Sequence, residues 1–156
     1  MEIKKNELGK DTYKLVSSLV PSVNIDLIII NEKKQILLTW RPASFKYNDG
    51  WHFPGGIIRL NETLSERCHK VAFSELGAKI KIKKKPAQIH QMILSQKYRS
   101  HFITFAYKAK LISGLDINKK FRRSKKEFGS WKWFDKCPKN LILPHLISYS
   151  HFFKKY

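Results

Sequence analysis

The sequence predicts a single domain of the α/β or α+β class, in which a mixed β-sheet is sandwiched between helices. The chain has 156 residues, a length that suits one domain with one core. Its 42% hydrophobic and 13% aromatic content indicates a globular chain. Strand-like segments flank isolated helical ones, and no repeat or linker divides them. We therefore expect one domain over residues 1–156.

The N-terminal part predicts a helix and a strand pair. Apolar side chains at helical spacing over Lys5–Val20 indicate a helix that ends before Pro21. The segments Val23–Ile30 and Gln35–Trp40 are strand-like and are joined by the turn-like residues NEKK. Turn-forming residues then predict a loop over Arg41–Gly50.

A helix over Thr63–Leu76 is the central predicted element, and the segment WHFPGG leads into it. Its apolar residues lie near one stripe, and Gly77 suits the end of the helix. Further strands are expected over residues 78–82, 87–94 and 101–111 and over the segment SWKWF.

Two segments complete the C-terminal part. The residues SGLDINKKFRRSKKEFGS predict a loop, because turn-forming and charged residues interrupt any periodicity. The segment Pro138–Lys154 predicts a helix that is broken near Pro144, since proline lacks the backbone donor that a helix interior needs.

The charge is strongly positive, with 31 Lys and Arg against 12 Asp and Glu, a net charge of +19. Such a field attracts anions, so nucleotides, nucleic acid and acidic membrane surfaces are all candidates for contact. A lysine-rich composition with solvated side chains is an equally good interpretation. The basic runs lack the regular aromatic residues expected of a track for single-stranded nucleic acid.

Compartment and membrane features point to the cytoplasm. No apolar run is long enough to span a membrane, and the N-terminus lacks the apolar core of a secretory signal. The two cysteines, Cys68 and Cys137, cannot form a disulfide framework and have no metal-type spacing. A reducing cytoplasm, without membrane attachment, is therefore expected.

Acidic residues are scarce, so their placement is informative. Between Gly50 and Leu115 there are only three, and all lie in GGIIRLNETLSERCHKVAFSELGA. Within this segment Gly56 is followed after five residues by Glu62, and Glu75 and Gly77 come later at fixed spacing. The spacing resembles the Nudix box, G-x5-E-x7-R-E-U-x-E-E-x-G-U, in which U is a bulky apolar residue. The resemblance implies a Nudix fold with its box over residues 56–78.

Two carboxylates of the box are absent. Val71 and Ser74 stand where the family has glutamates, and Lys70 replaces an arginine. Residues 71, 74 and 75 would share one helical face, which in the family directs carboxylates at one to three divalent cations. Glu75, with a backbone carbonyl from the glycine turn, can anchor about one ion, Mg²⁺ or Mn²⁺. The resemblance gives Glu62 a structural role, pairing with Lys70.

The loss of these two carboxylates resembles the pattern in one branch of the family, the GDP-mannose mannosyl hydrolases. That branch also lacks the glutamate at the position of Val71 and has a small residue at that of Ser74. Its first strand pair is similar to VNIDLIII and ILLTWR, so its aspartate and arginine correspond to Asp26 and Arg41. The similarity extends over residues 10–134. It implies a Mg²⁺-dependent hydrolase that releases GDP and free sugar by water attack at the anomeric carbon, acting as a homodimer.

The resemblance also implies roles for individual residues. The Mg²⁺ ligands would be the Gly55 carbonyl, Glu75 and Glu127. Arg41 would contact the diphosphate and stabilise the leaving group, and the Gly55–Gly56 pair would let the backbone approach closely. Asp26 would line the sugar or leaving-group region. Alternatively, Asp26 faces solvent or pairs with a lysine, and Arg41 is an ordinary loop charge.

The expected general base is missing, because the branch's histidine corresponds to Phe128, which cannot accept a proton. Three hypotheses follow. Another group acts, with Glu127, His101 or His90 as candidates; the protein hydrolyses slowly; or it only binds. His101 and His90 are otherwise ordinary hydrogen-bonded strand residues.

The leading functional hypothesis is thus a nucleotide-sugar hydrolase of the GDP-mannose kind. One alternative is a catalytically impaired Nudix module that binds nucleotide or RNA. The other is an ordinary Nudix pyrophosphatase that acts on another nucleoside diphosphate compound.

Overall fold

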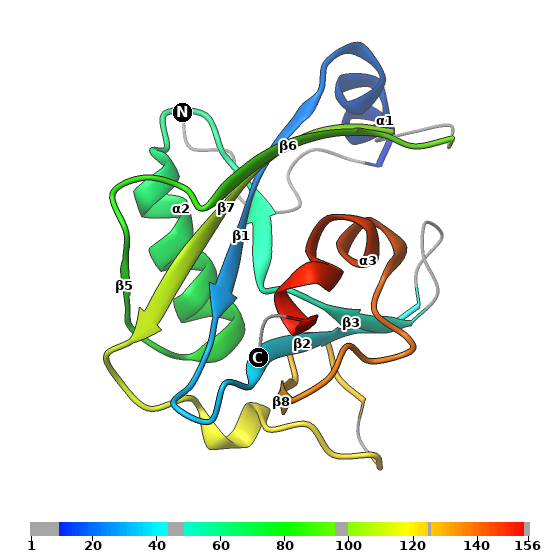
Figure 1. Cartoon of the computed structure of the whole chain (residues 1–156). Coiled ribbons are helices and arrows are strands. Elements are labelled where there is room, and N and C mark those ends of the chain that lie inside the picture. The colour runs from blue at the N-terminus through cyan, green and yellow to red at the C-terminus, as the bar shows by residue number, and fades with distance from the viewer. Residues whose placement is uncertain (1–9, 44–48, 96–99, 125, 155–156) are drawn as a thin grey trace.

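Two β-sheets and three α-helices form a mixed α+β domain in the computed structural model, which describes residues 10–43, 49–95, 100–124 and 126–154 (Figure 1). The larger, five-stranded sheet has the order β4-β1-β7-β5, and β6 also pairs with β7. Strands β1 and β7 are parallel and the other pairs are antiparallel, so the predicted mixed sheet is confirmed. The strands are β1 (Ser22–Ile29), β4 (Gly55–Ile57), β5 (Ile80–Ile82), β6 (Gln88–Ile93) and β7 (His101–Leu111).

The second sheet has three strands in the order β3-β2-β8. Its central strand β2 pairs antiparallel with both neighbours. The strands are β2 (Ile36–Arg41), β3 (Gly50–His52) and β8 (Trp131–Phe134). The lead-in WHFPGG therefore contributes two short strands, β3 and β4, where the sequence indicated only a turn.

The larger sheet lies between α2 (Leu64–Val71) and α3 (Leu143–Tyr149), as Figure 1 shows. Alternation along β1 explains the layering. Ile25 belongs to the apolar cluster that contains the α2 residues, whereas Ile28 belongs to the cluster that contains Tyr149 of α3. Burying each such side chain stabilises the fold by about 1.5–3 kcal/mol. Asp26 shares a side of β1 with Ile28 and therefore faces α3.

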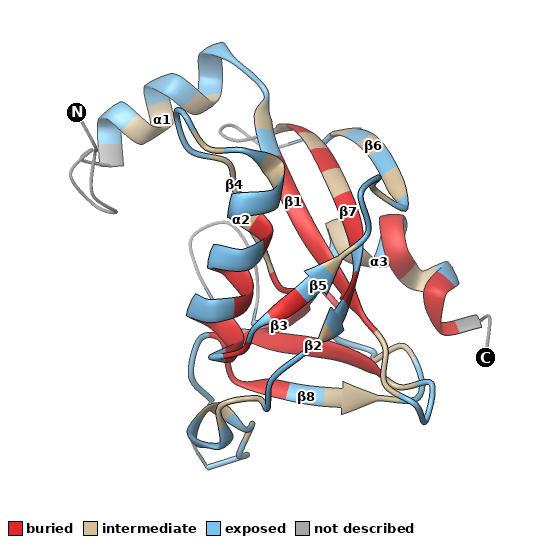
Figure 2. Cartoon of the chain, turned by 90° about the vertical axis from the view of Figure 1, so that its left-hand side faces the viewer, coloured by how far each residue is buried: buried red, intermediate tan, exposed pale blue. Residues whose placement is uncertain are grey.

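The remaining helices cover less. Helix α1 (Lys10–Leu19) is largely exposed, as Figure 2 shows, and its last residue, Leu19, is 71% exposed. The predicted N-terminal helix is confirmed from Lys10 onward, and its first residues lie outside the described ranges. Two 3-10 turns follow at η2 (Ile117–Lys119) and η3 (Ser150–Lys154). Among the described residues, no helix is both long and apolar enough to cross a membrane.

The helix of the glycine-rich segment begins as predicted. Thr63 caps α2, and Thr63 and Glu66 each bond the other's backbone N–H. The predicted end at Gly77 is also confirmed, with Gly77 at a φ of 63°.

Its last turn differs from the prediction, because Ala72–Leu76 form a π-helical turn, η1, instead of continuing the α-helix. The Gly77 N–H bonds the carbonyl of Ala72, five residues back. The carbonyl of Leu76 is taken by the N–H of Asp116 from a distant loop. A tertiary hydrogen bond therefore satisfies the last carbonyl of this turn.

Pro144 also differs from its prediction. It lies in the first turn of α3 and begins the helix instead of breaking it. In that position the missing N–H has no helical acceptor to lose, and the fixed φ of proline suits the turn.

Candidate functional site

We call residues 53–56 the glycine turn; they comprise the link between β3 and β4 and the first two residues of β4, which pairs with β1. Gly55 pairs with Asp26 across the two antiparallel strands. A Cβ atom at Gly55 would overlap the Asp26 carboxylate and would lie 2.7 Å from the Ile25 carbonyl oxygen. A Cβ at Gly56 would lie 3.2 Å from Val71. Gly55 is thus needed for close approach of the backbone, and a side chain at Gly56 would fit tightly against Val71. Val71 fills with a methyl group the place where the box usually has a carboxylate.

Glu75 is the buried carboxylate of this region. It lies in η1, and only 8% of its surface is exposed. The Thr39 hydroxyl of β2 donates to its Oε2 at 3.0 Å. Burial raises its pKa to about 7, although the Thr39 hydroxyl, the positive charge of Arg41 and a hydrogen bond from the Gly55 backbone oppose that shift.

Ser74 lies apart from Glu75. Its side chain is exposed, and its hydroxyl donates to the Val71 carbonyl at 3.3 Å. Val71 and Glu75 are both buried. The shared face expected for residues 71, 74 and 75 is therefore divided, because the π turn alters the angular spacing of an α-helix.

His52 extends the network behind Glu75. Its Nε2 lies 3.1 Å from Thr39 Oγ1, and its Nδ1 lies 2.8 Å from the Phe53 carbonyl oxygen, to which it can only donate. Burial lowers the pKa of His52 to about 3, and the charge of Arg41 adds to that effect. The Thr39 hydroxyl has one proton and faces two acceptors, so the protonation of His52 and that of Glu75 are coupled.

Asp26 is held from the opposite side by α3. The Tyr149 hydroxyl donates to Asp26 Oδ2 at 2.6 Å, and His145 Nε2 lies 3.5 Å from the same oxygen. His145 Nδ1 accepts the Phe53 N–H at 2.9 Å, so the neutral ring carries its proton on Nε2, toward Asp26. Burial, with the Asp26 charge, raises the pKa of Tyr149 far above its ordinary range, which keeps the hydroxyl a donor.

Asp26, His52 and His145 border one pocket, whereas Glu75, Thr39 and Tyr149 are not among its lining residues. Its lining includes four residues that the sequence predicted for the site, Asp26, Arg41, Gly55 and Gly56. It also includes His90, one of the candidates for the missing base, together with His52 and His145. One wall of the pocket is therefore the glycine turn with a cation beside it, and another is the sheet face that carries Asp26.

The residues present fit a divalent cation of limited coordination. Among the described residues there is no group of three or more His, Cys, Asp or Glu side chains that could hold a metal ion. Glu75 is nonetheless a buried carboxylate beside a backbone turn, and a bound cation would favour its ionised form. Mg²⁺ is commonly held by one or two carboxylates plus water and substrate phosphates. The donor set thus fits Mg²⁺ brought with a diphosphate, and does not fit an all-protein cage.

The late loop approaches the site through Phe128. Its ring stacks on that of His52 with centroids 6.1 Å apart, and 56% of Phe128 is exposed. Glu127, beside it, is exposed and borders a separate hollow with Lys120 and Arg122. The hydrophobic ring, and not the carboxylate, is therefore the group that the described loop presents to the His52 side of the pocket.

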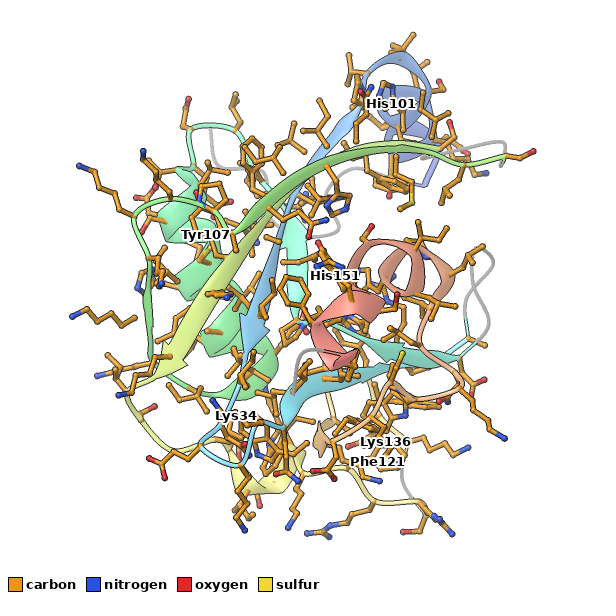
Figure 3. The ribbon with its side chains drawn as sticks, viewed as in Figure 1. Lys34, His101, Tyr107, Phe121, Lys136 and His151 are labelled. Carbon is orange, nitrogen blue, oxygen red and sulfur yellow. The ribbon has the colours of Figure 1, made fainter. Side chains whose placement is uncertain are left out.

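His101 is not brought to the pocket lining. It lies at the start of β7, in the upper part of Figure 3, and its Nε2 is 2.6 Å from Nε2 of Gln91. Its neighbours Phe102 and Thr104 do line the pocket. The structure therefore gives His101 a contact along the sheet instead of one with the candidate site.

Glu62 braces the loop before α2. Its carboxylate accepts from Arg67 Nε at 2.7 Å, lies 3.1 Å from Lys70 Nζ and accepts the Arg59 N–H at 2.9 Å. The pairing with Lys70 is the one that the resemblance implied. These contacts lower the pKa of Glu62 although burial opposes them.

Sequence reasoning missed Thr39, His145 and Tyr149. Nothing in the strand pattern distinguishes Thr39 from a core residue. The spacing of His145 and Tyr149, four residues apart in a predicted helix, does indicate a shared face. It gives no sign that this face meets Asp26. His52 was also not among the predicted site residues, and the structure places it in the pocket lining.

Known proteins share this fold. The family model of the NUDIX domain matches residues 20–136, which is most of the chain. The MutT protein from Methanosarcina mazei Go1 has a similar structure, with a TM-score of 0.64, 17% sequence identity and coverage of 88% of this chain and 94% of that one. A MutT Nudix hydrolase from Burkholderia pseudomallei has a TM-score of 0.63 and 20% sequence identity, with coverage of 83% of this chain and 95% of that one. At such identities these likenesses show the fold.

Two further matches cover a smaller share of the related protein. A UDP-X diphosphatase has a TM-score of 0.57 at 20% identity and covers 86% of this chain and 64% of that one. The low-salt glycan biosynthesis protein Agl8 of Haloferax volcanii is 35% identical over 72 residues, or 46% of this chain. That match covers 45% of Agl8, so this comparison spans less than half of the relative's length.

Proposed function

This chain belongs to the Nudix family, and we propose that it is a Mg²⁺-dependent hydrolase of a nucleotide-sugar of the GDP-mannose kind. The products would be GDP and free sugar, formed by water attack at the anomeric carbon. The observation that carries the proposal is the box itself, in which Glu75 remains as a buried carboxylate while the position of Val71 is packed against Gly56. The partial similarity to a glycan biosynthesis protein supports the choice of a sugar-bearing substrate.

The metal would be held by Glu75 and the Gly55 carbonyl. When bound, Mg²⁺ supplies positive charge that stabilises a leaving diphosphate. Fewer protein carboxylates are needed for that task than for activating water at phosphorus, because the substrate phosphates complete the coordination. Glu127, the third ligand implied by the resemblance, would have to turn toward the pocket from its exposed position.

The chain's own residues bind and orient the substrate in this proposal. Arg41 borders the pocket beside the glycine turn and would neutralise charge that builds on the diphosphate. The Gly55–Gly56 backbone leaves space for the phosphates to approach. Asp26, fixed by Tyr149, would line the region of the sugar and the departing oxygen.

Product analysis tests the proposal directly. Purified protein is incubated with GDP-mannose and Mg²⁺, and GDP and free mannose are measured. Glu75→Gln is the matched control because it keeps the size of the side chain and removes its charge. We expect the wild type to release both products and the variant to fall by at least about 100-fold, an order typical of the loss of one charged active-site interaction. Equal product release by the two proteins would exclude the proposal.

Phe128 offers a second test. In the related branch a histidine at this position is implied to accept the proton of the attacking water, whereas Phe128 only stacks on His52. We expect Phe128→His to raise the turnover of GDP-mannose by roughly 10²-fold, the contribution of a positioned general base. Phe128→Leu is the control, since it changes the ring without adding a base. Unchanged turnover in Phe128→His would show that the loop does not supply this group.

An ordinary Nudix pyrophosphatase is distinguished by its products, because it would give mannose 1-phosphate and GMP from GDP-mannose. The absence of carboxylates at Val71 and Ser74 disfavours this alternative, since attack at phosphorus uses a richer metal cluster.

A nucleotide- or RNA-binding module is the second candidate. It is favoured by the net charge of +19 and by Phe128 in place of a base.

A further inference from the structure

A row of three polar side chains crosses the larger sheet on the face that carries Asp26. Asn24 of β1 pairs with Thr104 of β7, and Thr104 pairs in turn with His90 of β6. Cross-strand partners point to the same side of a sheet. We call Asn24, Thr104 and His90 the polar row. All three line the pocket beside the glycine turn.

The polar row begins where the apolar cover of the sheet ends. On the same face, Ile28 and Ala106 are packed in the cluster that contains Tyr149 of α3. Asn24 and Thr104 are almost as deeply buried, at 8% and 4% exposure, but they are polar. Buried polar side chains destabilise a fold unless they form hydrogen bonds. Asn24 and Thr104 therefore bring polar groups to the wall of the pocket.

His90 supplies the second observation. Its Nδ1 is buried and has no hydrogen-bond partner among the described residues. Burial also lowers the pKa of His90, so the ring is neutral near pH 7. A neutral imidazole nitrogen in a pocket wall can donate to or accept from a ligand, depending on its tautomer.

The chemistry of the row selects its ligand. An amide, a hydroxyl and a neutral imidazole each offer both donor and acceptor capacity, and none carries a charge. They therefore suit hydroxyl groups, which also donate and accept, and they lack the positive charge that complements phosphate. The cation Arg41 and the glycine turn border the same pocket and suit the phosphate end. The pocket is thus divided into an anion-binding part and a neutral hydrogen-bonding part.

Spacing favours the sugar that is attached directly to the phosphate. Strand β1 is the neighbour of β4, which carries Gly55 and Gly56. Neighbouring strands lie about 5 Å apart, so Asn24 is one spacing and Thr104 about 10 Å from the glycine strand. A nucleobase would have to reach past its ribose, so this distance suits a sugar joined to the diphosphate, and comparison with the free diphosphate separates the second sugar from the ribose.

We propose that Asn24, Thr104 and His90 form the subsite that binds the hydroxyl groups of the sugar in a nucleotide-sugar. This inference rests on the proposed function, because it assigns one end of the pocket to the sugar of that substrate. It also goes beyond it, since it names residues that decide how a nucleotide-sugar is distinguished from the corresponding nucleoside diphosphate.

Equilibrium binding provides the test. Dissociation constants are measured by calorimetry, with Mg²⁺, for GDP-mannose, UDP-glucose and ADP-ribose and for GDP, UDP and ADP. If a nucleotide-sugar is turned over, its KM and the competitive Ki of its diphosphate replace the two constants. The proteins are the wild type, Thr104→Val and His90→Phe. Gln91→Ala is the control, because Gln91 is adjacent to His90 but lies on the opposite face of β6.

We expect at least one nucleotide-sugar to bind the wild type more tightly than its own diphosphate. Thr104→Val and His90→Phe should each weaken the binding of that nucleotide-sugar by roughly five- to tenfold, as the loss of one hydrogen bond predicts. The dissociation constant of the diphosphate should change by less than about twofold, and Gln91→Ala should leave the dissociation constants of both ligands unchanged. The midpoint of thermal unfolding should not fall in His90→Phe without ligand, since Nδ1 has no partner to lose among the described residues.

Two results would overturn the inference. One is that no nucleotide-sugar in the panel binds more tightly than its diphosphate. The other is that the row variants weaken the binding of the diphosphate as much as that of the nucleotide-sugar, which would assign the row to the nucleoside. Failure of the proposed function looks different. In that case GDP-mannose is not cleaved. The subsite is still supported if a nucleotide-sugar binds more tightly than its diphosphate and the row variants remove that difference in affinity.

Discussion

Glu75 shows how much the function of a single residue depends on its surroundings. The side chain is a buried carboxylate that receives one hydrogen bond from Thr39 and lies behind a turn of two glycines. In this environment the ionised form is disfavoured unless a positive charge is near. The same glutamate on an exposed helix would be an ordinary solvated charge, so burial is what makes it a candidate metal ligand.

His52 predicts a dependence of stability on pH. Its folded pKa is about 3, below the ordinary 6.5, so the unfolded chain binds a proton that the folded chain excludes. Stability should therefore fall as the pH decreases from about 6.5 toward 3, by about 1.4 kcal/mol per pH unit from this residue. Urea unfolding between pH 5 and 7 measures the slope. His52→Gln should flatten it by that amount, and parallel curves for the two proteins would contradict the assignment.

Gly55 predicts a steric effect. Alanine would place a methyl group against the Asp26 carboxylate and 2.7 Å from the Ile25 carbonyl oxygen. We expect Gly55→Ala to lower the free energy of unfolding by about 1–3 kcal/mol, as overpacking does. Gly114→Ala is the matched control, because no atom lies within 4 Å of its added Cβ. Equal unfolding free energies for the two variants would show that the β1–β4 contact can relax.

At the scale of elements, the site is assembled from three parts that are distant in sequence. The glycine turn and η1 contribute Gly55 and Glu75, β1 contributes Asp26, and α3 contributes His145 and Tyr149. Helix α3 lies beyond residue 136, where the family match ends. A helix outside the matched region therefore positions a carboxylate inside it.

The link between α3 and β1 can be measured. Tyr149→Phe removes the hydroxyl that donates to Asp26 at 2.6 Å and leaves a buried carboxylate with one donor fewer. We expect a loss of about 1.5–3 kcal/mol in the free energy of unfolding, as for hydrogen bonds to charged groups. Tyr107→Phe, in β7, is the comparison, since its ring is also buried but faces the α2 cluster. An equal loss in both variants would show that the Asp26 contact is not special.

Most elements could be predicted, because their patterns are local. Alternation in residues 101–111 and the apolar run of Val23–Ile30 indicate strands, and the structure has β7 and β1 there. The π turn at Ala72–Leu76 could not be predicted, because the apolar spacing of these residues is equally compatible with a continued α-helix. Pro144 was misplaced because a proline is compatible with both the break and the first turn of a helix.

At the scale of the whole molecule, charge is the dominant property. The net charge of +19 acts beyond any one site and attracts polyanions without specifying them. The sequence by itself does not separate a binding surface from a lysine-rich composition. Salt dependence does separate them, because binding to phosphates releases counterions.

A short RNA therefore serves as the test of the binding-module alternative. If the alternative holds, the association constant should fall by about 10³-fold or more between 50 and 200 mM salt, as expected for several phosphate contacts. Fluorescence anisotropy of a labelled oligonucleotide measures this. Free GDP at the same salt concentrations is the control, since it makes few contacts. Weak affinity at the lowest salt concentration would exclude the RNA-binding alternative.

The sequence alone determined the family-specific layout: a glycine turn, a capped helix and Glu75 as the single acid left at the three positions predicted to face a metal. These features are local in the chain, so spacing reveals them. Only the tertiary structure decided that Thr39 donates to that acid and which groups line the pocket beside the glycine turn. Thr39, His145 and the polar row come from strands and a helix that are remote in sequence, and their proximity follows from strand pairing and packing. Local patterns cannot report such contacts, because burial and hydrogen bonding between distant segments arise only when the chain is folded.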